Sequence, residues 1–139
     1  MSGSGRLSVI ATPIGNLGDL SERAIAALRA ADVVACEDTR RTGQLMRHLG
    51  ATAKLVSIHQ HQEASRAAAV RDQVGAGKSV ALVSDAGAPA VSDPGARVVA
   101  AVLAAGLPVE VIPGPSAGTA ALAVSGLPAD RFTFVGVLP

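Results

Sequence analysis

The chain has 139 residues, enough for one domain with a substantial buried core. Its 12 Lys and Arg residues and 11 Asp and Glu residues leave a net charge of +1, which excludes a domain that holds nucleic acid by strong basic charge alone. The single cysteine, Cys36, excludes an internal disulfide, and no apolar stretch is long enough for a membrane span, so we expect a cytoplasmic protein.

Short apolar runs alternate with longer helical patterns, which is typical of βαβ units that feed a parallel sheet. The predicted strands are residues 7–12, 32–36, 54–58, 79–83 and 109–112. The predicted helices are a segment that begins at Ser21, a short helix that ends at Gly50, residues 63–76, a helix that ends at Ala105, and residues 117–124. We therefore expect an α/β fold, with a mostly parallel sheet flanked by helices on both faces.

The two ends of the chain depart from this pattern. Residues 1–5, Met-Ser-Gly-Ser-Gly, are typical of a flexible leader outside the fold. Residues 132–135 have strand character, and we interpret residues 132–139 as the start of a connection to a further domain. Residues 6–131 are then expected to form one α/β domain.

Four unusual loops follow predicted strands, at residues 13–18, 37–40, 84–95 and 113–117. Ligands of open parallel sheets bind at the carboxyl ends of the strands, where loops and helix N-termini converge. Glycine lets a ligand approach the backbone closely, and proline fixes the shape of a loop in advance. A single loop of this kind would be an ordinary turn between two elements, but four of them at one edge of a sheet predict a ligand site.

Charged residues in these loops have two interpretations each. Asp85 directly follows a central strand, where its carboxylate could accept hydrogen bonds from a ligand or brace the loop backbone. Asp93 is interpreted as a helix cap and is not placed in the site. Glu37, Asp38 and Arg40 either form a local ion-pair network or contact a substrate at the edge of the cleft.

The histidines and the standard nucleotide-binding motifs do little to identify the ligand. His59 and His61 could share a face at a strand end, but no further ligands cluster there, so we predict no metal. Either histidine could be a general base, although exposed loop histidines are commoner. The chain lacks the Gly-x-Gly-x-x-Gly motif, yet Glu37 lies about twenty residues beyond the first glycine loop, where dinucleotide-binding domains carry a ribose-binding acid. A Rossmann-type dinucleotide-binding module therefore stays an alternative.

At these loops the sequence resembles a known family. The motifs are Ala11-Thr-Pro-Ile-Gly-Asn16, Cys36-Glu-Asp-Thr-Arg40, Val83-Ser-Asp-Ala-Gly-Ala-Pro89 with Ser92-Asp-Pro-Gly95, and Ile112-Pro-Gly-Pro-Ser-Ala117. In this order they closely resemble the small-subunit (16S) ribosomal RNA cytidine 2′-O-methyltransferase I family of the tetrapyrrole (corrin/porphyrin) methylase superfamily. The resemblance runs from about Arg6 to the last residue.

The resemblance implies a class III methyltransferase-like domain that binds S-adenosylmethionine, as the N-terminal half of a two-domain enzyme that is usually a homodimer. The implied reaction methylates the ribose 2′-hydroxyl of a cytidine in the decoding region of 16S rRNA in the small ribosomal subunit, and we expect this domain alone to be inactive. The implied cofactor contacts are Pro13, Ile14, Gly15, Asn16, Leu17, Asp85, Ala86, Gly87, Ala88, Pro89, Pro115, Ser116 and Ala117. The implied substrate-side residues are Glu37, Asp38, Thr39 and Arg40.

The implied chemistry also needs a proton acceptor. Methyl transfer from a sulfonium is an in-line displacement, which a protein accelerates chiefly by aligning the reacting atoms. Because a ribose hydroxyl is a poor nucleophile, a general base is expected, and Asp38, His59 and Asp85 are the candidates, with no order among them. A base from the further domain or a water molecule stays an alternative. A methylase of another substrate in the same superfamily stays an alternative, although the 37–40 and 84–87 motifs favour the RNA branch by resemblance.

Overall fold

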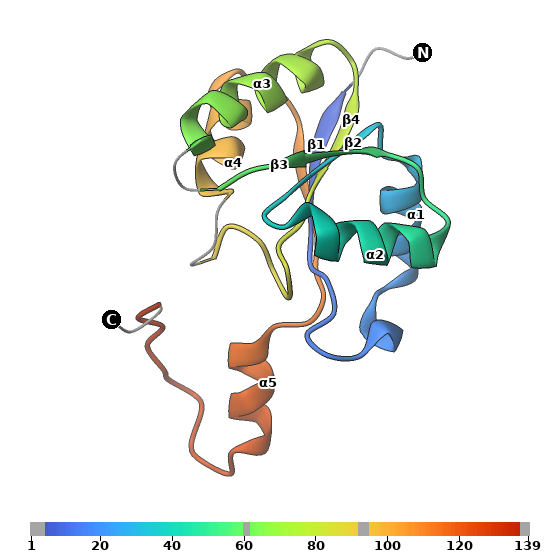
Figure 1. Cartoon of the computed structure of the whole chain (residues 1–139). Helices are drawn as coiled ribbons and strands as arrows, with labels where there is room; N and C mark the ends of the chain where they lie inside the picture. Colours follow the sequence, from blue (N-terminus) through green and yellow to red (C-terminus); the bar gives the residue numbers. More distant parts are fainter. Residues whose placement is uncertain (1–4, 60–61, 92–94, 137–139) are drawn as a thin grey trace.

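The computed structural model describes residues 5–59, 62–91 and 95–136, and its centre is a five-stranded sheet between helices (Figure 1). Every pairing between the named strands is parallel, so the predicted α/β class is confirmed. The strands are β1 (Arg6–Ile10), β2 (Val33–Cys36), β3 (Lys54–Ser57), β4 (Ser79–Leu82) and β5 (Val109–Ile112). The helices are the 3₁₀ turn η1 (Leu17–Asp19), α1 (Glu22–Ala30), α2 (Thr39–Leu49), α3 (Glu63–Gly75), α4 (Ala96–Ala104) and α5 (Ala117–Val124).

The strand order, β3-β2-β4-β1-β5, explains why helices cover both faces of the sheet. From β1 the chain moves toward one edge through α1 and α2, and after β3 it reverses and crosses to the other edge through α3 and α4. Because crossovers between parallel strands are right-handed, opposite directions of travel place the helices on opposite faces. Figure 1 shows α3 and α4 grouped on one side of the strands and α1 and α2 on the other.

Two hydrophobic cores follow from this arrangement. Leu28 of α1 and Met46 of α2 pack with Val34 on one face of the sheet. Val70 of α3 and Val98 of α4 belong to the cluster on the other face. The central strands β2 and β4 supply side chains to both cores, and small residues on the helices allow close packing.

The helix boundaries have local causes. The Ser21 hydroxyl accepts a hydrogen bond from Ala24 N at 3.0 Å and caps α1, and Gly50 ends α2 with a left-handed φ of 67°. Glu63 of α3 accepts hydrogen bonds from Gly95 N at 2.9 Å and Arg97 N at 3.1 Å, which fixes the start of α4. The contacts of Ser21 and Glu63 lie at helix starts, next to the loops at the carboxyl edge of the sheet.

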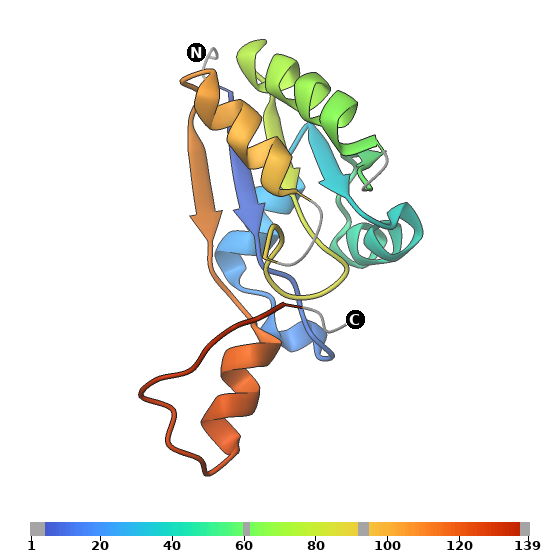
Figure 2. The same cartoon turned by 90° about the vertical axis from the view of Figure 1, so that its left-hand side faces the viewer.

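The chain after β5 differs from the rest. We call residues 113–136 the carboxyl-terminal arm and residues 5–112 the body. None of the residues of the arm is buried, and α5 extends away from the body (Figure 2). The predicted strand at residues 132–135 is wrong, because these residues are exposed and pair with no strand of the body. Apolar and aromatic residues form a strand only where a neighbouring strand accepts their hydrogen bonds.

Several residues for which the sequence supports a prediction lie outside the ranges that the structure describes, or at their ends. Residues 1–4 of the expected leader, His61, Asp93 and residues 137–139 lie outside the described residues. Gly5 is buried just before β1, and a Cβ added to it would clash with the carbonyl oxygens of Val74 and Lys78. In the described ranges, no helix is both long enough and apolar enough to cross a membrane.

Candidate functional site

The loops after β1 and β4 meet at the carboxyl edge of the sheet. These strands are neighbours, but β1 is followed by α1 on one face and β4 by α4 on the other, which opens a crevice between their loops. Thr12 and Gly87 join the two loops by an antiparallel bridge, with Thr12 N donating to Gly87 O at 3.0 Å and Gly87 N to Thr12 O at 2.9 Å. The crevice is therefore cross-linked through backbone groups.

The loop after β5 lies against Gly87, where the β1 and β4 loops meet. Gly87 has a φ of 76°, and a Cβ added there would lie 3.5 Å from Ile14 Cγ2 and 3.6 Å from Pro115 O. A Cβ on Gly114 would lie 3.1 Å from Ala11 Cβ, so the β5 loop packs tightly on the end of β1. Three of the four loops singled out in the sequence thus converge in the structure.

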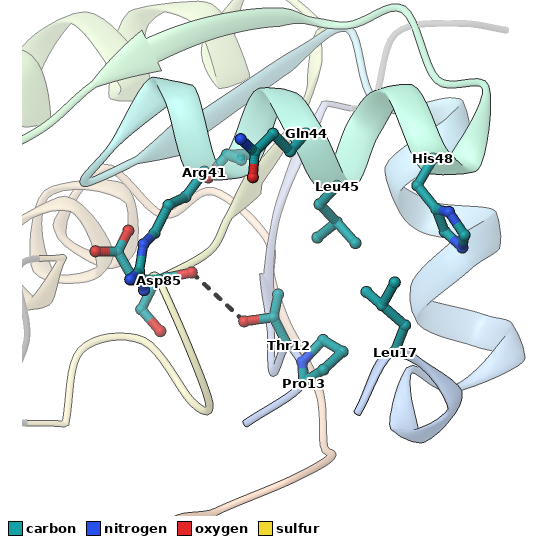
Figure 3. Close-up of a pocket in the computed structure, with 10 residues that line it drawn as sticks. Thr12, Pro13, Leu17, Arg41, Gln44, Leu45, His48 and Asp85 are labelled. Carbon is teal, nitrogen blue, oxygen red and sulfur yellow. Dashed lines mark hydrogen bonds between the residues drawn. The ribbon is translucent and has the colours of Figure 1, made fainter. Parts of the chain in front are cut away.

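Beside this junction lies a cavity of about 390 Å³, open to solvent (Figure 3). Its walls come from the β1 loop, the β4 loop and one face of α2. The lining residues are Thr12, Pro13, Leu17, Arg41, Thr42, Gln44, Leu45, His48, Ser84 and Asp85. A volume of this size is in the range of small-molecule sites.

Asp85 carries the most informative polar group of the cavity. Its Oδ1 atom is buried and has no hydrogen-bond partner in the described chain. The β4 loop is braced by hydroxyls instead, because Ser84 Oγ donates to Ala86 O at 2.9 Å and Thr12 Oγ1 donates to Ser84 O at 3.4 Å. Burying an unpaired carboxylate oxygen is costly, so the interpretation of Asp85 as a ligand contact is favoured over that of a backbone brace.

The 37–40 motif lies beside the cavity without lining it. The Asp38 carboxylate accepts a hydrogen bond from Arg40 N at 2.9 Å and caps α2, of which Thr39 is the first residue. Arg40 Nε lies 3.8 Å from Asp38 Oδ1 and its side chain is almost fully exposed. The local ion pair is therefore present, and such an exposed pair adds little stability. Glu37 accepts a hydrogen bond at its carbonyl from Ser57 Oγ at 3.3 Å.

The next residues of α2 line the cavity, and sequence reasoning missed them. Arg41, Gln44, Leu45 and His48 lie three, four and seven positions apart, which is the spacing of one helix face. The opposite face, with Met46, is buried in the core. The sequence did contain a signal for these residues, because polar side chains recur every three or four positions along a helix whose opposite face is apolar.

His59, the remaining candidate base, and Cys36, the single cysteine, are not among the residues that line the cavity. His59 is exposed beyond the edge strand β3 and is not among the lining residues of the cavity. Cys36 is buried at the end of β2, where desolvation raises the pKa of its thiol, the nearby Asp85 and Asp38 carboxylates raise it further, and a hydrogen bond with Thr42 lowers it. In the part of the chain that the structure describes, no group of three or more His, Cys, Asp or Glu side chains could hold a metal.

The implied cofactor residues fall into two groups. Pro13, Leu17 and Asp85 line the cavity. The others lie outside the lining, in the loops around the junction: Ile14, Gly15, Asn16, Ala86, Gly87, Ala88, Pro89, Pro115, Ser116 and Ala117.

Several residues of the second group shape their loops. The Asn16 side chain accepts a hydrogen bond from Gly18 N at 2.8 Å and caps η1, and Gly15 has a φ of 148° in open surroundings. Ser116 and Ala117 form the start of α5 on the arm. Ala90, a little further along the β4 loop, has a φ of 70°, which is uncommon for a residue with a Cβ and indicates a loop shape imposed by its surroundings.

Curated relatives cover the whole chain. A "Ribosomal RNA small subunit methyltransferase I" of Xylella fastidiosa (strain Temecula1 / ATCC 700964) is 52% identical over 139 residues, which are 100% of this chain and 51% of the relative. The protein of the same name from Escherichia coli O157:H7 is 45% identical over 135 residues, 97% of this chain and 47% of the relative. The chain thus spans about half the length of these relatives.

Solved structures share the fold. A uroporphyrin-III-C-methyltransferase from Thermus thermophilus matches with a TM-score of 0.68 and 30% identity, over 90% of this chain and 54% of that one. A diphthine synthase matches with a TM-score of 0.72 and 20% identity, over 94% of this chain and 52% of that one, and shows likeness of fold alone. Residues 6–138 match the family described as Tetrapyrrole (Corrin/Porphyrin) Methylases. The chain therefore belongs to the tetrapyrrole (corrin/porphyrin) methylase family.

Proposed function

We propose that this chain is the S-adenosylmethionine-binding part of an enzyme that methylates the ribose 2′-hydroxyl of a cytidine in small-subunit ribosomal RNA. One observation carries the proposal: a methylase-family domain holds an unpaired, buried carboxylate oxygen of Asp85 in the crevice between its β1 and β4 loops. The relatives at 45–52% identity bear the name of an rRNA methyltransferase, which favours RNA over the substrate of the 30% identical uroporphyrin methyltransferase.

The residues at the crevice fit such a cofactor. The β1, β4 and β5 loops offer backbone groups at glycines that other residues would not replace easily, because Gly87 has a positive φ and a Cβ on Gly114 would lie 3.1 Å from Ala11 Cβ. Leu17 and Leu45 add apolar surface to a cavity whose other lining residues are largely polar. When bound, S-adenosylmethionine supplies a methyl group on a positively charged sulfur, which an attacking oxygen takes up. The residues that would hold it are those of the β1, β4 and β5 loops implied by the resemblance.

Asp85 is the general base that this geometry supports best. Of the three candidates only Asp85 lines the cavity, because Asp38 caps α2 and His59 lies beyond the edge strand. An unpaired carboxylate oxygen can accept a hydrogen bond from a hydroxyl and take its proton as the oxygen attacks. Asp85 would then hold the proton that the ribose hydroxyl gives up.

The remaining parts of the proposal concern the whole protein. Its substrate would be 16S rRNA within the small ribosomal subunit, in the decoding region. We expect a cytoplasmic homodimer, because the family resemblance implies one. The exposed start of α2, including Glu37 to Arg40, would face the substrate side.

Calorimetric titration of the full-length protein that carries this chain tests the cofactor. S-adenosylmethionine should bind and NAD should not. Binding of NAD without binding of S-adenosylmethionine would instead support the dinucleotide-binding module. Transfer of a tritiated methyl group to 30S subunits, and no transfer to uroporphyrinogen III, tests the substrate. The opposite preference would identify a methylase of another substrate.

Three substitutions separate the candidate bases. Asp85→Asn keeps the size of the side chain and should lower kcat for 30S methylation by about 10²-fold or more, since it removes the proton acceptor. Asp38→Asn and His59→Gln are matched controls that should leave kcat nearly unchanged. If Asp85→Asn raises the Kd for S-adenosylmethionine but leaves kcat at saturating cofactor unchanged, then Asp85 anchors the cofactor and is not the base.

A further inference from the structure

The outer wall of the cavity is a strip of α2 that the proposed chemistry does not use. Arg41, Gln44 and His48 all line the cavity and all are exposed. They lie on the wall opposite the β1 loop, with Arg41 extending toward the side where Asp85 lies and His48 next to Leu17 (Figure 3). We define these three residues as the α2 strip.

The strip carries the positive charge of Arg41, which pairs with no carboxylate of the described residues. The sequence of α2, TRRTGQLMRHL, has three arginines, one histidine and no acidic residue, whereas the whole chain has a net charge of only +1. Within the described ranges, Arg41 makes no ion pair: Asp38 lies by Arg40, and Asp85, which lines the same cavity, forms no salt bridge with Arg41. The positive charge of the strip is therefore available to a ligand.

The length of the strip distinguishes between ligands. Arg41 and His48 are seven residues apart, which is about 10 Å along a helix axis. One carboxylate or one phosphate cannot reach both ends, but an extended chain of phosphates and riboses can. Arg, Gln and His side chains are donors that commonly contact phosphate and sugar oxygens of nucleic acids.

We propose that the α2 strip, Arg41, Gln44 and His48, holds the ribose-phosphate backbone of the RNA substrate beside the nucleotide that enters the cavity. This inference rests on the proposed function and adds to it which residues position the RNA. Arg41 and His48 are positioning residues, because they fix where the ribose lies relative to Asp85 without taking part in the reaction. Contacts of this kind contribute affinity that falls with salt concentration.

The test uses the full-length protein with Arg41→Gln, His48→Gln and the double variant. Arg47→Gln is the matched control, because Arg47 is exposed on the same helix and does not line the cavity. Filter binding to 30S subunits at several salt concentrations measures affinity without turnover, tritiated methyl transfer gives KM and kcat, and calorimetry gives the Kd for S-adenosylmethionine.

Arg41→Gln should raise the Kd and the KM for 30S subunits about tenfold and lower the slope of log affinity against log salt by about one. The Kd for S-adenosylmethionine should not change, and Arg47→Gln should behave as the unmodified protein. Equal effects of Arg41→Gln and Arg47→Gln would overturn the inference, because they would indicate unspecific attraction. A weaker S-adenosylmethionine affinity with unchanged 30S affinity would also overturn it and assign Arg41 to the cofactor.

The two proposals fail separately. Salt-dependent 30S binding that needs Arg41, without any methyl transfer, would refute the proposed function and support the strip. Methyl transfer with an Arg41-independent KM would support the function and refute the strip.

Discussion

The body and the carboxyl-terminal arm are both rich in apolar residues, but they use them in opposite ways. In the body, Leu7, Leu28 and Leu82 are fully buried between the sheet and its helices. In the arm, Val124 is 86% exposed, and Phe132 and Phe134, the only aromatic residues of the chain, are 59% and 61% exposed. Composition alone therefore does not tell which apolar residues stabilise this fold.

The difference has a topological cause. Each helix from α1 to α4 lies in a crossover between two parallel strands, so its apolar face is turned onto the sheet. In the residues that the structure describes, α5 follows β5 and no further strand comes after it. With eight residues and none of them buried, α5 is shorter than helices that are stable in isolation. We therefore expect the stability of the body to be independent of the arm.

The largest expected effect comes from truncating apolar side chains in the two regions. Leu82→Ala should lower the free energy of unfolding by about 2–5 kcal/mol, because it leaves a cavity in a central strand. Val124→Ala should change it by no more than about 0.5 kcal/mol, as is usual for exposed positions. Urea denaturation of both variants measures the contrast. A comparable loss in Val124→Ala would show that the arm is packed in solution.

Replacing Gly5 and Gly118 by alanine should change stability in opposite directions. Gly5→Ala should destabilise the protein by about 1–3 kcal/mol, because the new methyl group meets the backbone of Val74 and Lys78. Gly118→Ala, in α5, meets nothing within 4 Å and should increase helix content, with a gain of up to about 1 kcal/mol in the helical state. Denaturation measures the first effect and far-ultraviolet circular dichroism the second. A harmless Gly5→Ala would show that residue 5 lies outside the folded body.

Helix starts provide the next contrast. Glu63→Ala should cost about 0.5–2 kcal/mol, because Gly95 N and Arg97 N at the start of α4 lose their acceptor. Ser116→Ala should have little effect on stability, since the Ser116 side chain makes no capping hydrogen bond at the start of α5. Thermal denaturation of the two variants checks this. The comparison would be contradicted if both variants lost the same stability.

The smallest expected effect is a dependence of the body's stability on pH. Burial raises the pKa of the Cys36 thiol in the folded state, so the folded protein keeps a proton that the unfolded chain loses above roughly pH 8.5. The unfolded state then binds fewer protons, and stability falls as the pH rises through this range. Denaturation between pH 7 and 10 should show this decline, and Cys36→Ala should flatten it. A decline of equal slope in Cys36→Ala would attribute the effect to other groups.

Much of the body could be predicted from the sequence, because its signals are local. The β2 and β4 strands are apolar on both faces, and Ser21 and Gly50 mark helix ends with side chains and backbone angles suited to them. The strand predicted at residues 132–135 failed because strand propensity does not reveal whether a partner strand exists. The order of the strands also depends on contacts between distant segments, which no local pattern encodes.

The same distinction applies to the cavity. Asp85 could be found because a carboxylate directly after a central strand is conspicuous, although the sequence could not say whether it braces the loop. Arg41 and His48 were missed because polar residues on a helix ordinarily face water. Only the placement of α2 beside the β1 and β4 loops makes them part of a site.

The position of β4 between β1 and β2 also governs how the chain can fold as it is synthesised. Leu7 of β1 pairs with Val80 of β4 and with Val109 of β5, both far along the chain, whereas β2 and β3 pair with each other early. β1 is thus synthesised well before either of its neighbours, and its apolar residues stay unpaired until β4 and β5 have been made. During that interval the exposed apolar residues and the unpaired backbone of β1 are prone to aggregation with other unfolded chains.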